Sequence, residues 1–178
     1  AECRKWRRPQ HKPAIKASIA TRFNQRVQMD LFFIWNRCYN LVIDECIRYR
    51  VAMPLENKTA ICLLREMLQH WIRYFGPMHT LVLDQEGGMV SELASRFCDR
   101  YSVKRIFAGT DDHTMTGLVE CNIQLTRLAS LKIWSDVQRQ SLPITQDDCV
   151  MEAAMVGNLI TNVDGATPAQ ALFGFQPR

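Results

Sequence analysis

Short apolar segments with strand periodicity recur along the chain. Val27, Met29, Leu31 and Phe33 alternate with Gln28, Asp30 and Phe32, which is the pattern of a strand with one buried face. Two more apolar segments follow closely and are joined by a polar turn at 44–48, so the first three strands are predicted to pair antiparallel. The predicted strands are 27–33, 41–43, 49–53, 80–83 and 103–107.

Helical periodicity fills the intervals after the third strand. A first amphipathic helix is predicted after Asn57, a candidate N-cap, and before Gly76-Pro77. Its apolar stripe is Ile61, Leu64, Leu68, Trp71 and Phe75, and the next helix carries Val90, Leu93, Phe97 and Tyr101. A third helix, reaching about Gln140, is predicted to pack through Leu118, Cys121, Leu125 and Leu128; two more begin at Thr145 and Thr167-Pro168. This order predicts an α/β fold, a five-stranded mixed sheet flanked by helices.

Composition narrows the class of protein. A chain of 178 residues with 47% apolar and 22% charged residues can build one domain with a real core. Seven cysteines, an odd number without a C-x-x-C pair, argue against a disulfide framework and for a reducing, intracellular location, nuclear or cytoplasmic. No apolar run approaches the roughly 20 residues that cross a bilayer, so no membrane association is expected. The chain starts with charged residues and no apolar leader and stops just after Pro177, so we expect that it has no signal peptide and is cut from a longer polypeptide.

Positive charge is concentrated at the N-terminus. Residues 1–26 hold eight Lys and Arg against the single acid Glu2, whereas 27–178 hold 14 basic and 17 acidic residues. Pro9 and Pro13 disfavour regular structure there, so we expect residues 1–22 to be a basic linker and the folded core to span 23–178. Clustered Lys and Arg suit a polyanion through release of phosphate counterions, although a solvated linker has the same composition.

Three acidic residues stand where a sheet can bring them together. Asp30 lies on the first predicted strand, Asp84 ends the fourth, and Glu120 lies early in the third helix. Asp84 and Glu120 are separated by 35 residues, and Asp30 and Glu66 share that spacing. Glu66 is about 180° from the apolar stripe of its own helix, so it is expected to face solvent. Glu120 instead shares a polar helix face with Gln124 and Arg127, which suits a phosphate.

These acidic residues carry a family resemblance. Met29-Asp30-Leu31, Leu83-Asp84-Gln85-Glu86-Gly87 and Thr116-Gly117-Leu118-Val119-Glu120 resemble the D,D-35-E signature of retroviral and retrotransposon integrase cores. The resemblance extends to 40–50, to 167–174, which is similar to the segment after the core in retrotransposon polyproteins, and to 3–9, which is similar to the end of an upstream zinc module with Cys3 as its last ligand. The rest of that module is absent, so no zinc site can form from this chain.

The resemblance implies a ribonuclease H-like fold and Mg²⁺-dependent or Mn²⁺-dependent chemistry on DNA. Asp30, Asp84 and Glu120 would be the catalytic residues and the ligands of two metal ions, since hard carboxylate oxygens suit these cations. The implied reactions are trimming of the element's DNA ends and their joining to target DNA, by a protein that forms homo-oligomers. Candidate DNA contacts are His113, Thr116, Gln124, Arg127 and Lys132.

Three positions depart from the family pattern. Glu86 stands where the family usually has Gly, Thr116 where Asn is common, and Cys121 where a basic residue is frequent. Because all three acidic residues are present, a competent integrase is the favoured hypothesis. A decayed remnant that only binds nucleic acid and a ribonuclease H-like nuclease without joining activity remain the alternatives.

Overall fold

A five-stranded mixed sheet forms the centre of this computed structural model, which describes residues 20–84, 87–108 and 116–177. The strand order is β3-β2-β1-β4-β5, with β1, β2 and β3 antiparallel and with β4 and β5 parallel to β1. The predicted α/β fold with a five-stranded mixed sheet is therefore confirmed. The strands are β1 (Arg26–Ile34), β2 (Arg37–Asp44), β3 (Arg50–Leu55), β4 (Thr80–Leu83) and β5 (Lys104–Phe107).

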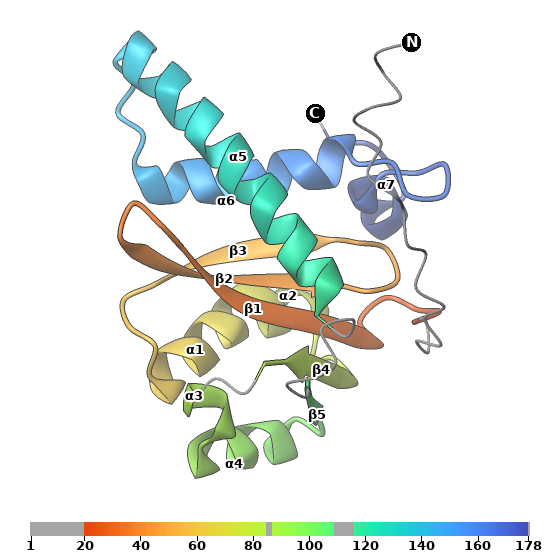
Figure 1. The fold of residues 1–178 in the computed structure, drawn as a ribbon. Helices are drawn as coiled ribbons and strands as arrows, with labels where there is room; N and C mark the ends of the chain where they lie inside the picture. The colour runs from red at the N-terminus through yellow and green to blue at the C-terminus, as the bar shows by residue number, and fades with distance from the viewer. Residues whose placement is uncertain (1–19, 85–86, 109–115, 178) are drawn as a thin grey trace, which may run out of the picture.

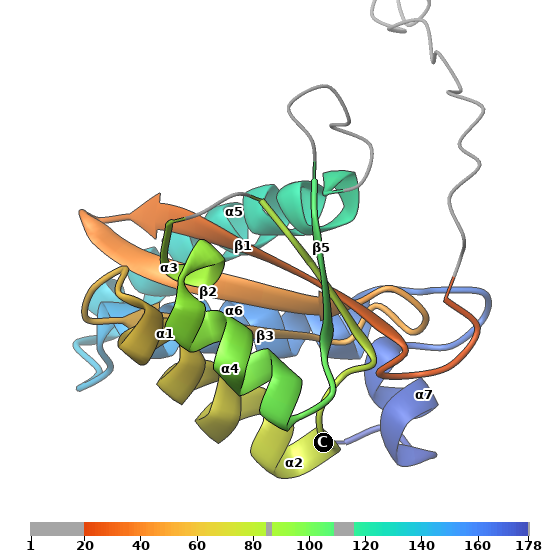
Figure 2. The same cartoon turned by 90° about the horizontal axis from the view of Figure 1, so that it is seen from below.

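Helices cover both faces of the sheet (Figure 1). One face carries α1 (Ala60–Met67), α3 (Gly87–Val90) and α4 (Glu92–Arg100), and the opposite face carries α5 (Gly117–Gln140) and α6 (Gln146–Ile160). The remaining helical segments are η2 (Leu68–Ile72), α2 (Arg73–Phe75) and α7 (Pro168–Phe173). Figure 2 shows β4 and β5 running beside β1 toward the start of α5. No helix in the described part of the chain has the length and hydropathy needed to cross a membrane.

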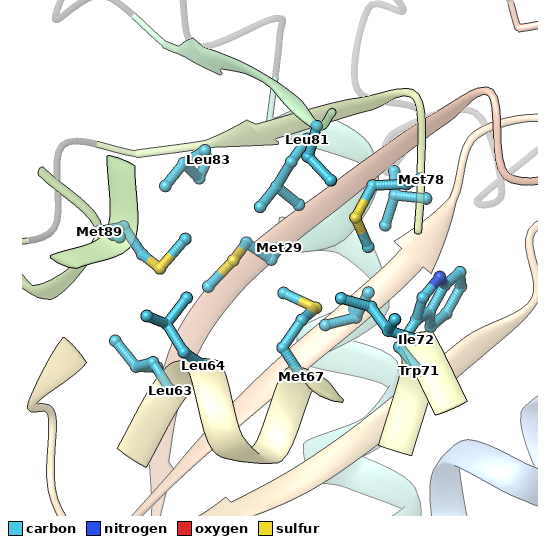
Figure 3. Packing of buried hydrophobic residues seen from close by; sticks show 14 of the residues in the cluster. Met29, Leu63, Leu64, Met67, Trp71, Ile72, Met78, Leu81, Leu83 and Met89 are labelled. Carbon is cyan, nitrogen blue, oxygen red and sulfur yellow. The ribbon is translucent and has the colours of Figure 1, made fainter. Parts of the chain in front are cut away.

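The face covered by α1 is packed almost entirely with apolar side chains (Figure 3). The predicted apolar stripe of this helix is partly wrong, because Ile61 is 60% and Leu68 is 37% exposed. A π-helical turn, η2, interrupts the α-helical spacing at Leu68, so the buried positions do not follow one regular stripe. The buried side chains of α1 and η2 are Cys62, Leu63, Leu64, Met67, Trp71 and Ile72.

The prediction for the buried side of α5 is wrong at three of its four positions: Leu118 packs against the apolar cluster around Phe32, but Cys121 is exposed. Leu125 and Leu128 are 51% and 58% exposed, whereas Asn122, Thr126 and Ser130 are buried against the sheet. These three side chains donate hydrogen bonds to carbonyl oxygens one turn earlier on α5 itself, at distances of 2.7–2.8 Å. The hydroxyls of Thr126 and Ser130 are thereby satisfied within the helix, whereas Oδ1 of Asn122 accepts a hydrogen bond from the Arg50 guanidinium on β3.

Helix starts were predicted better than helix faces. The hydroxyl of Thr145 caps α6 in a capping box with Asp148, and Thr167 caps α7, which ends at Gly174. At α1 the N-cap is Thr59, while the predicted cap Asn57 accepts a hydrogen bond from the Thr59 amide. Most of the predicted basic linker lies outside the described residues, which begin at 20.

Candidate active site

Two neighbouring strands bring Asp30 and Asp84 to the same place in the sheet. In the parallel register of β1 and β4, Met29 pairs with Leu83. Asp30 and Asp84 are the next residue on each strand, and neighbouring strands are about 4.8 Å apart. The expectation that the first and fourth strands are adjacent is therefore confirmed, although the two carboxylates are 54 residues apart in the sequence.

The side-chain alternation of the strands assigns both aspartates to the face that α5 covers. Val27 and Met29 of β1, and Leu81 and Leu83 of β4, belong to the apolar cluster on the α1 face. The residues between and after them point to the other side of the sheet, since side chains alternate along a strand. Asp30 is half-buried and its Oδ1 accepts the Leu31 amide at 2.7 Å, and Asp84 is exposed.

The first turn of α5 lies beside β1. The backbone N–H of Val119 donates to the side-chain Oε1 of Gln28 at 3.1 Å, and Gln28 is two residues before Asp30 on the same face of β1. Glu120 follows Val119 and is exposed. Its Oε1 accepts a hydrogen bond from the Thr116 hydroxyl at 2.9 Å. One carboxylate from α5 thus stands next to the strand that carries Asp30.

The chemistry of this donor set fits a hard divalent cation, because Asp30, Asp84 and Glu120 offer only carboxylate oxygens. Within the described residues, however, no group of three or more His, Cys, Asp or Glu side chains is gathered closely enough to hold a metal ion. The backbone therefore brings the three positions into one region without closing a three-ligand site. Glu66, with the same spacing from Asp30, is on α1 across the sheet, half-buried, and contacts His70 at 3.1 Å.

Comparisons with known proteins bear on the fold that carries these residues. No family model matches the chain. A segment of 79 residues, 44% of this chain and 6% of the relative, is 27% identical to the retrovirus-related Pol polyprotein from transposon 412 of Drosophila melanogaster. The magnesium-bound catalytic core of HTLV-2 integrase, in its trimeric form, superposes with a TM-score of 0.69 at 18% identity, over 83% of this chain and 95% of that one. The chain has the fold of a retroviral integrase catalytic core. This confirms the ribonuclease H-like sheet that the sequence resemblance implied.

Two other solved structures share the integrase core fold. The core of BIV integrase matches with a TM-score of 0.70 at 15% identity, over 83% of this chain and 93% of that one. A chain of the simian T-cell lymphotropic virus intasome in complex with the PP2A regulatory subunit B56 gamma matches with a TM-score of 0.77 at 18% identity. That match covers 96% of this chain and 62% of the intasome chain. The chain thus spans less than two thirds of that protein and a small part of the polyprotein.

Among the described residues, the side chains proposed to contact DNA do not form one continuous surface. Gln124 is exposed and Arg127 is half-buried, with its guanidinium carbon 5.7 Å from the centroid of the Phe32 ring, and both share the helix side of Glu120. Lys132 is exposed but lies about 18 Å along α5 from Glu120, at a rise of about 1.5 Å per residue. Thr116 is buried and its hydroxyl bonds to Glu120, while His113 and the departure at Glu86 lie outside the described residues.

Gln28 also lies beside the candidate site, and no sequence motif singled it out. This side chain is 5% exposed, and it joins β1 to the backbone of α5 next to Glu120. The available signal was a polar residue two positions before Asp30, on the same face of a strand whose other face is apolar. That signal identifies a buried polar group, but it does not identify the amide that the group contacts.

Proposed function

We propose that this chain is the catalytic core of a retrotransposon integrase, which trims the DNA ends of the element and joins them to target DNA. The observation that carries the proposal is the placement of Asp30 on β1 beside Asp84, which directly follows the neighbouring strand β4, on the face against which the first turn of α5 packs. An integrase core fold supports the same function, because homologues with this fold include a magnesium-bound core and an intasome chain.

Each of the three carboxylates is carried by a different element of the fold. Asp30 extends from the central strand, Asp84 from the neighbouring strand end, and Glu120 from a helix, so the ligands approach from three elements. Two bound Mg²⁺ ions would activate the attacking oxygen and stabilise the leaving oxygen in an in-line displacement at phosphorus. Because Glu120 is held by the Thr116 hydroxyl, binding by all three carboxylates requires a side-chain rotation at one or more of them.

DNA is the proposed partner, and the surface beside Glu120 is its proposed place of contact. Gln124 can donate and accept hydrogen bonds with phosphate and sugar oxygens, and Arg127 supplies a positive charge. The basic segment 1–26 would add sequence-independent affinity. A homo-oligomer is also proposed, since joining two DNA ends requires two active sites, and the HTLV-2 core was solved in dimeric and trimeric forms.

The decisive experiment replaces Asp84 by Asn. We expect Asp84→Asn to abolish Mg²⁺-dependent cleavage and joining of a labelled DNA end, because the amide keeps the shape but loses the charge that a cation requires. Asp99→Asn is the matched control, since Asp99 is an exposed aspartate on α4, on the opposite face of the sheet from α5. Both variants should unfold at nearly the parent urea concentration.

The products distinguish this proposal from its alternatives. Cleaved and joined DNA in the parent, lost in Asp84→Asn and kept in Asp99→Asn, supports an integrase. Cleavage without a joined product supports a ribonuclease H-like nuclease. Metal-independent DNA binding with no cleavage by the parent supports a decayed remnant. Equal activity of Asp84→Asn and the parent contradicts the assignment of the site.

A further inference from the structure

The N-terminus of α5 lacks an ordinary side-chain cap. Its N-cap residue, Thr116, has helical backbone angles (φ −104°, ψ −3°) and makes no capping hydrogen bond, because its hydroxyl donates to Glu120. The amide of Val119, at the third helical position, therefore has no acceptor within the helix. Val119 is fully buried, so this amide needs a partner other than bulk water.

That partner comes from the sheet. The Oε1 atom of Gln28 accepts the Val119 amide at 3.1 Å, and the Nε2 atom of the same side chain donates to Oε1 of Glu45 at 2.8 Å. Glu45 is fixed in turn by Arg26, whose Nε lies 2.8 Å from the same oxygen. Because Nε2 of Gln28 donates to Glu45, the orientation of the Gln28 side-chain amide is fixed, and its oxygen faces α5.

We propose that Gln28 is a positioning residue for Glu120: it caps α5 from strand β1 and thereby fixes the carboxylate of α5 relative to Asp30. Gln28 and Asp30 are two residues apart on one face of one strand, and Val119 and Glu120 are adjacent on one helical turn. A single hydrogen bond thus links the two backbone segments that carry these carboxylates. This inference rests on the proposed function, because it assigns Gln28 a role through the metal ligands.

The test measures Mn²⁺ binding to the whole chain, by the loss of the free Mn²⁺ signal in electron paramagnetic resonance. Gln28→Met keeps the side-chain length and removes both hydrogen bonds. We expect Mn²⁺ affinity to fall about 10-fold, the usual cost of removing a contact that orients a metal ligand. Gln28→Glu keeps the oxygen that accepts the Val119 amide but replaces the donor to Glu45 with a carboxylate oxygen. It is therefore combined with Glu45→Gln, whose amide can donate to the new carboxylate, and this double variant should recover most of the affinity.

Two further variants separate positioning from general stability. Thr126→Val removes a buried hydroxyl from the same helix, where it donates to the Asn122 carbonyl at 2.8 Å, and should leave Mn²⁺ affinity unchanged. In a Glu120→Gln background, Gln28→Met should have no additional effect, because the ligand that it positions is already lost.

The remaining outcomes overturn the proposal in distinguishable ways. If Glu120→Gln lowers Mn²⁺ affinity but Gln28→Met does not, Gln28 is not a positioning residue and the proposed function stands. If Gln28→Met and Thr126→Val lower the affinity equally, or if Gln28→Met acts undiminished in the Glu120→Gln background, its effect is structural. If Glu120→Gln itself leaves Mn²⁺ affinity at the parent value, both the metal site and the role of Gln28 are wrong.

Discussion

The two faces of the sheet are packed by different physical means. On the α1 face, side chains such as Met29, Leu63 and Trp71 form a continuous apolar cluster. On the α5 face, a smaller apolar cluster around Phe32 is accompanied by a set of buried polar side chains. The buried polar side chains that join sheet and helices on that face are Gln28, Arg50, Asn122 and Asn158.

The two kinds of packing differ in how precisely they orient a helix against the sheet. Apolar contacts are non-directional, so the α1 face gains stability in proportion to the area that it buries. Hydrogen bonds require a particular geometry, and those on the α5 face tie individual residues of the helices to individual strands. Asn158 of α6 bonds to both the amide and the carbonyl of Arg50, at 2.9 and 2.8 Å. The directional face is the one that carries Glu120.

The largest expected effect on stability comes from the apolar face. Leu63 is 1% exposed in the α1 cluster, so Leu63→Ala should lower the free energy of unfolding by about 3 kcal/mol through lost burial and a residual cavity. Urea denaturation measures this, with Leu128→Ala as the control, since Leu128 is largely exposed. Mn²⁺ affinity should be unchanged at temperatures where Leu63→Ala is folded. A fall in affinity would show that the α1 face also orients the site.

The next effect tests the polar face at Gly157 of α6. An added Cβ at this position would overlap the guanidinium of Arg50, which is buried and bonds to Asn122 and Thr161. Gly157→Ala should therefore lower the free energy of unfolding by about 2 kcal/mol, a typical cost of overpacking. Gly117→Ala is the control, because a Cβ there meets no atom within 4 Å.

A double-mutant cycle identifies the cause of the Gly157 effect. If the cost arises from the guanidinium, Gly157→Ala should cost much less when Arg50 is already Ala, because the overlapping atoms are then absent. An undiminished cost in that background would mean that the backbone of α6, and not Arg50, requires glycine.

The sequence predicted the sheet well for a physical reason. Period-two alternation in β1 and the apolar segment Thr80–Leu83 depend on residues that are near each other in the chain, so the pattern is local. The buried face of α5 was for the most part predicted wrongly because three of its buried side chains, Asn122, Thr126 and Ser130, are polar. The hydroxyls of Thr126 and Ser130 donate to carbonyl oxygens of the helix itself. A prediction from the spacing of apolar residues does not include buried side chains of this kind.

The candidate site rests on a resemblance that the strand register supports only in part. Resemblance to a known motif predicted Asp30, Asp84 and Glu120 as its residues, and the register of β1 and β4 explains why the first two positions lie side by side. The contact of Gln28 with the Val119 amide joins residues 91 positions apart, and no local pattern predicts such a pair. Whether the three carboxylates bind metal together stays a prediction for the experiments on Asp84 and Glu120.

Asn40 is a buried polar side chain on the apolar face, and replacing it sharpens the comparison. It pairs with Leu31 and Met53 in the sheet, so its side chain shares their apolar side. It is fully buried, and within the described part of the chain neither its Nδ2 nor its Oδ1 has a hydrogen-bond partner. Asn40→Val should raise the free energy of unfolding by about 1 kcal/mol, since it removes two unsatisfied polar groups and suits a strand.

Asn40→Asp is the opposite variant, because it places a charge at the same buried position, and it should destabilise the fold strongly at pH 7. Urea denaturation of the parent and both variants makes the test. A loss of stability in Asn40→Val would show that the α1 face depends on a polar group after all.

The smallest effect belongs to a polar contact at the exposed end of α6. The Thr145 hydroxyl and amide donate to Oδ2 of Asp148 at 2.6 and 2.8 Å, and these hydrogen bonds hold the pKa of that carboxyl below its usual range. A carboxylate with a lowered pKa stabilises the fold above its unfolded pKa of about 3.9, and this contribution is lost as the pH falls through the folded pKa. Asp148→Asn should therefore cost about 0.5 kcal/mol at pH 7 and progressively less as the pH falls below about 4. Urea denaturation of the parent and Asp148→Asn across this range measures the difference. A cost for Asp148→Asn that stays constant at every pH would show that shape, and not charge, makes this cap. The comparison between the faces would then rest on the buried hydrogen bonds alone.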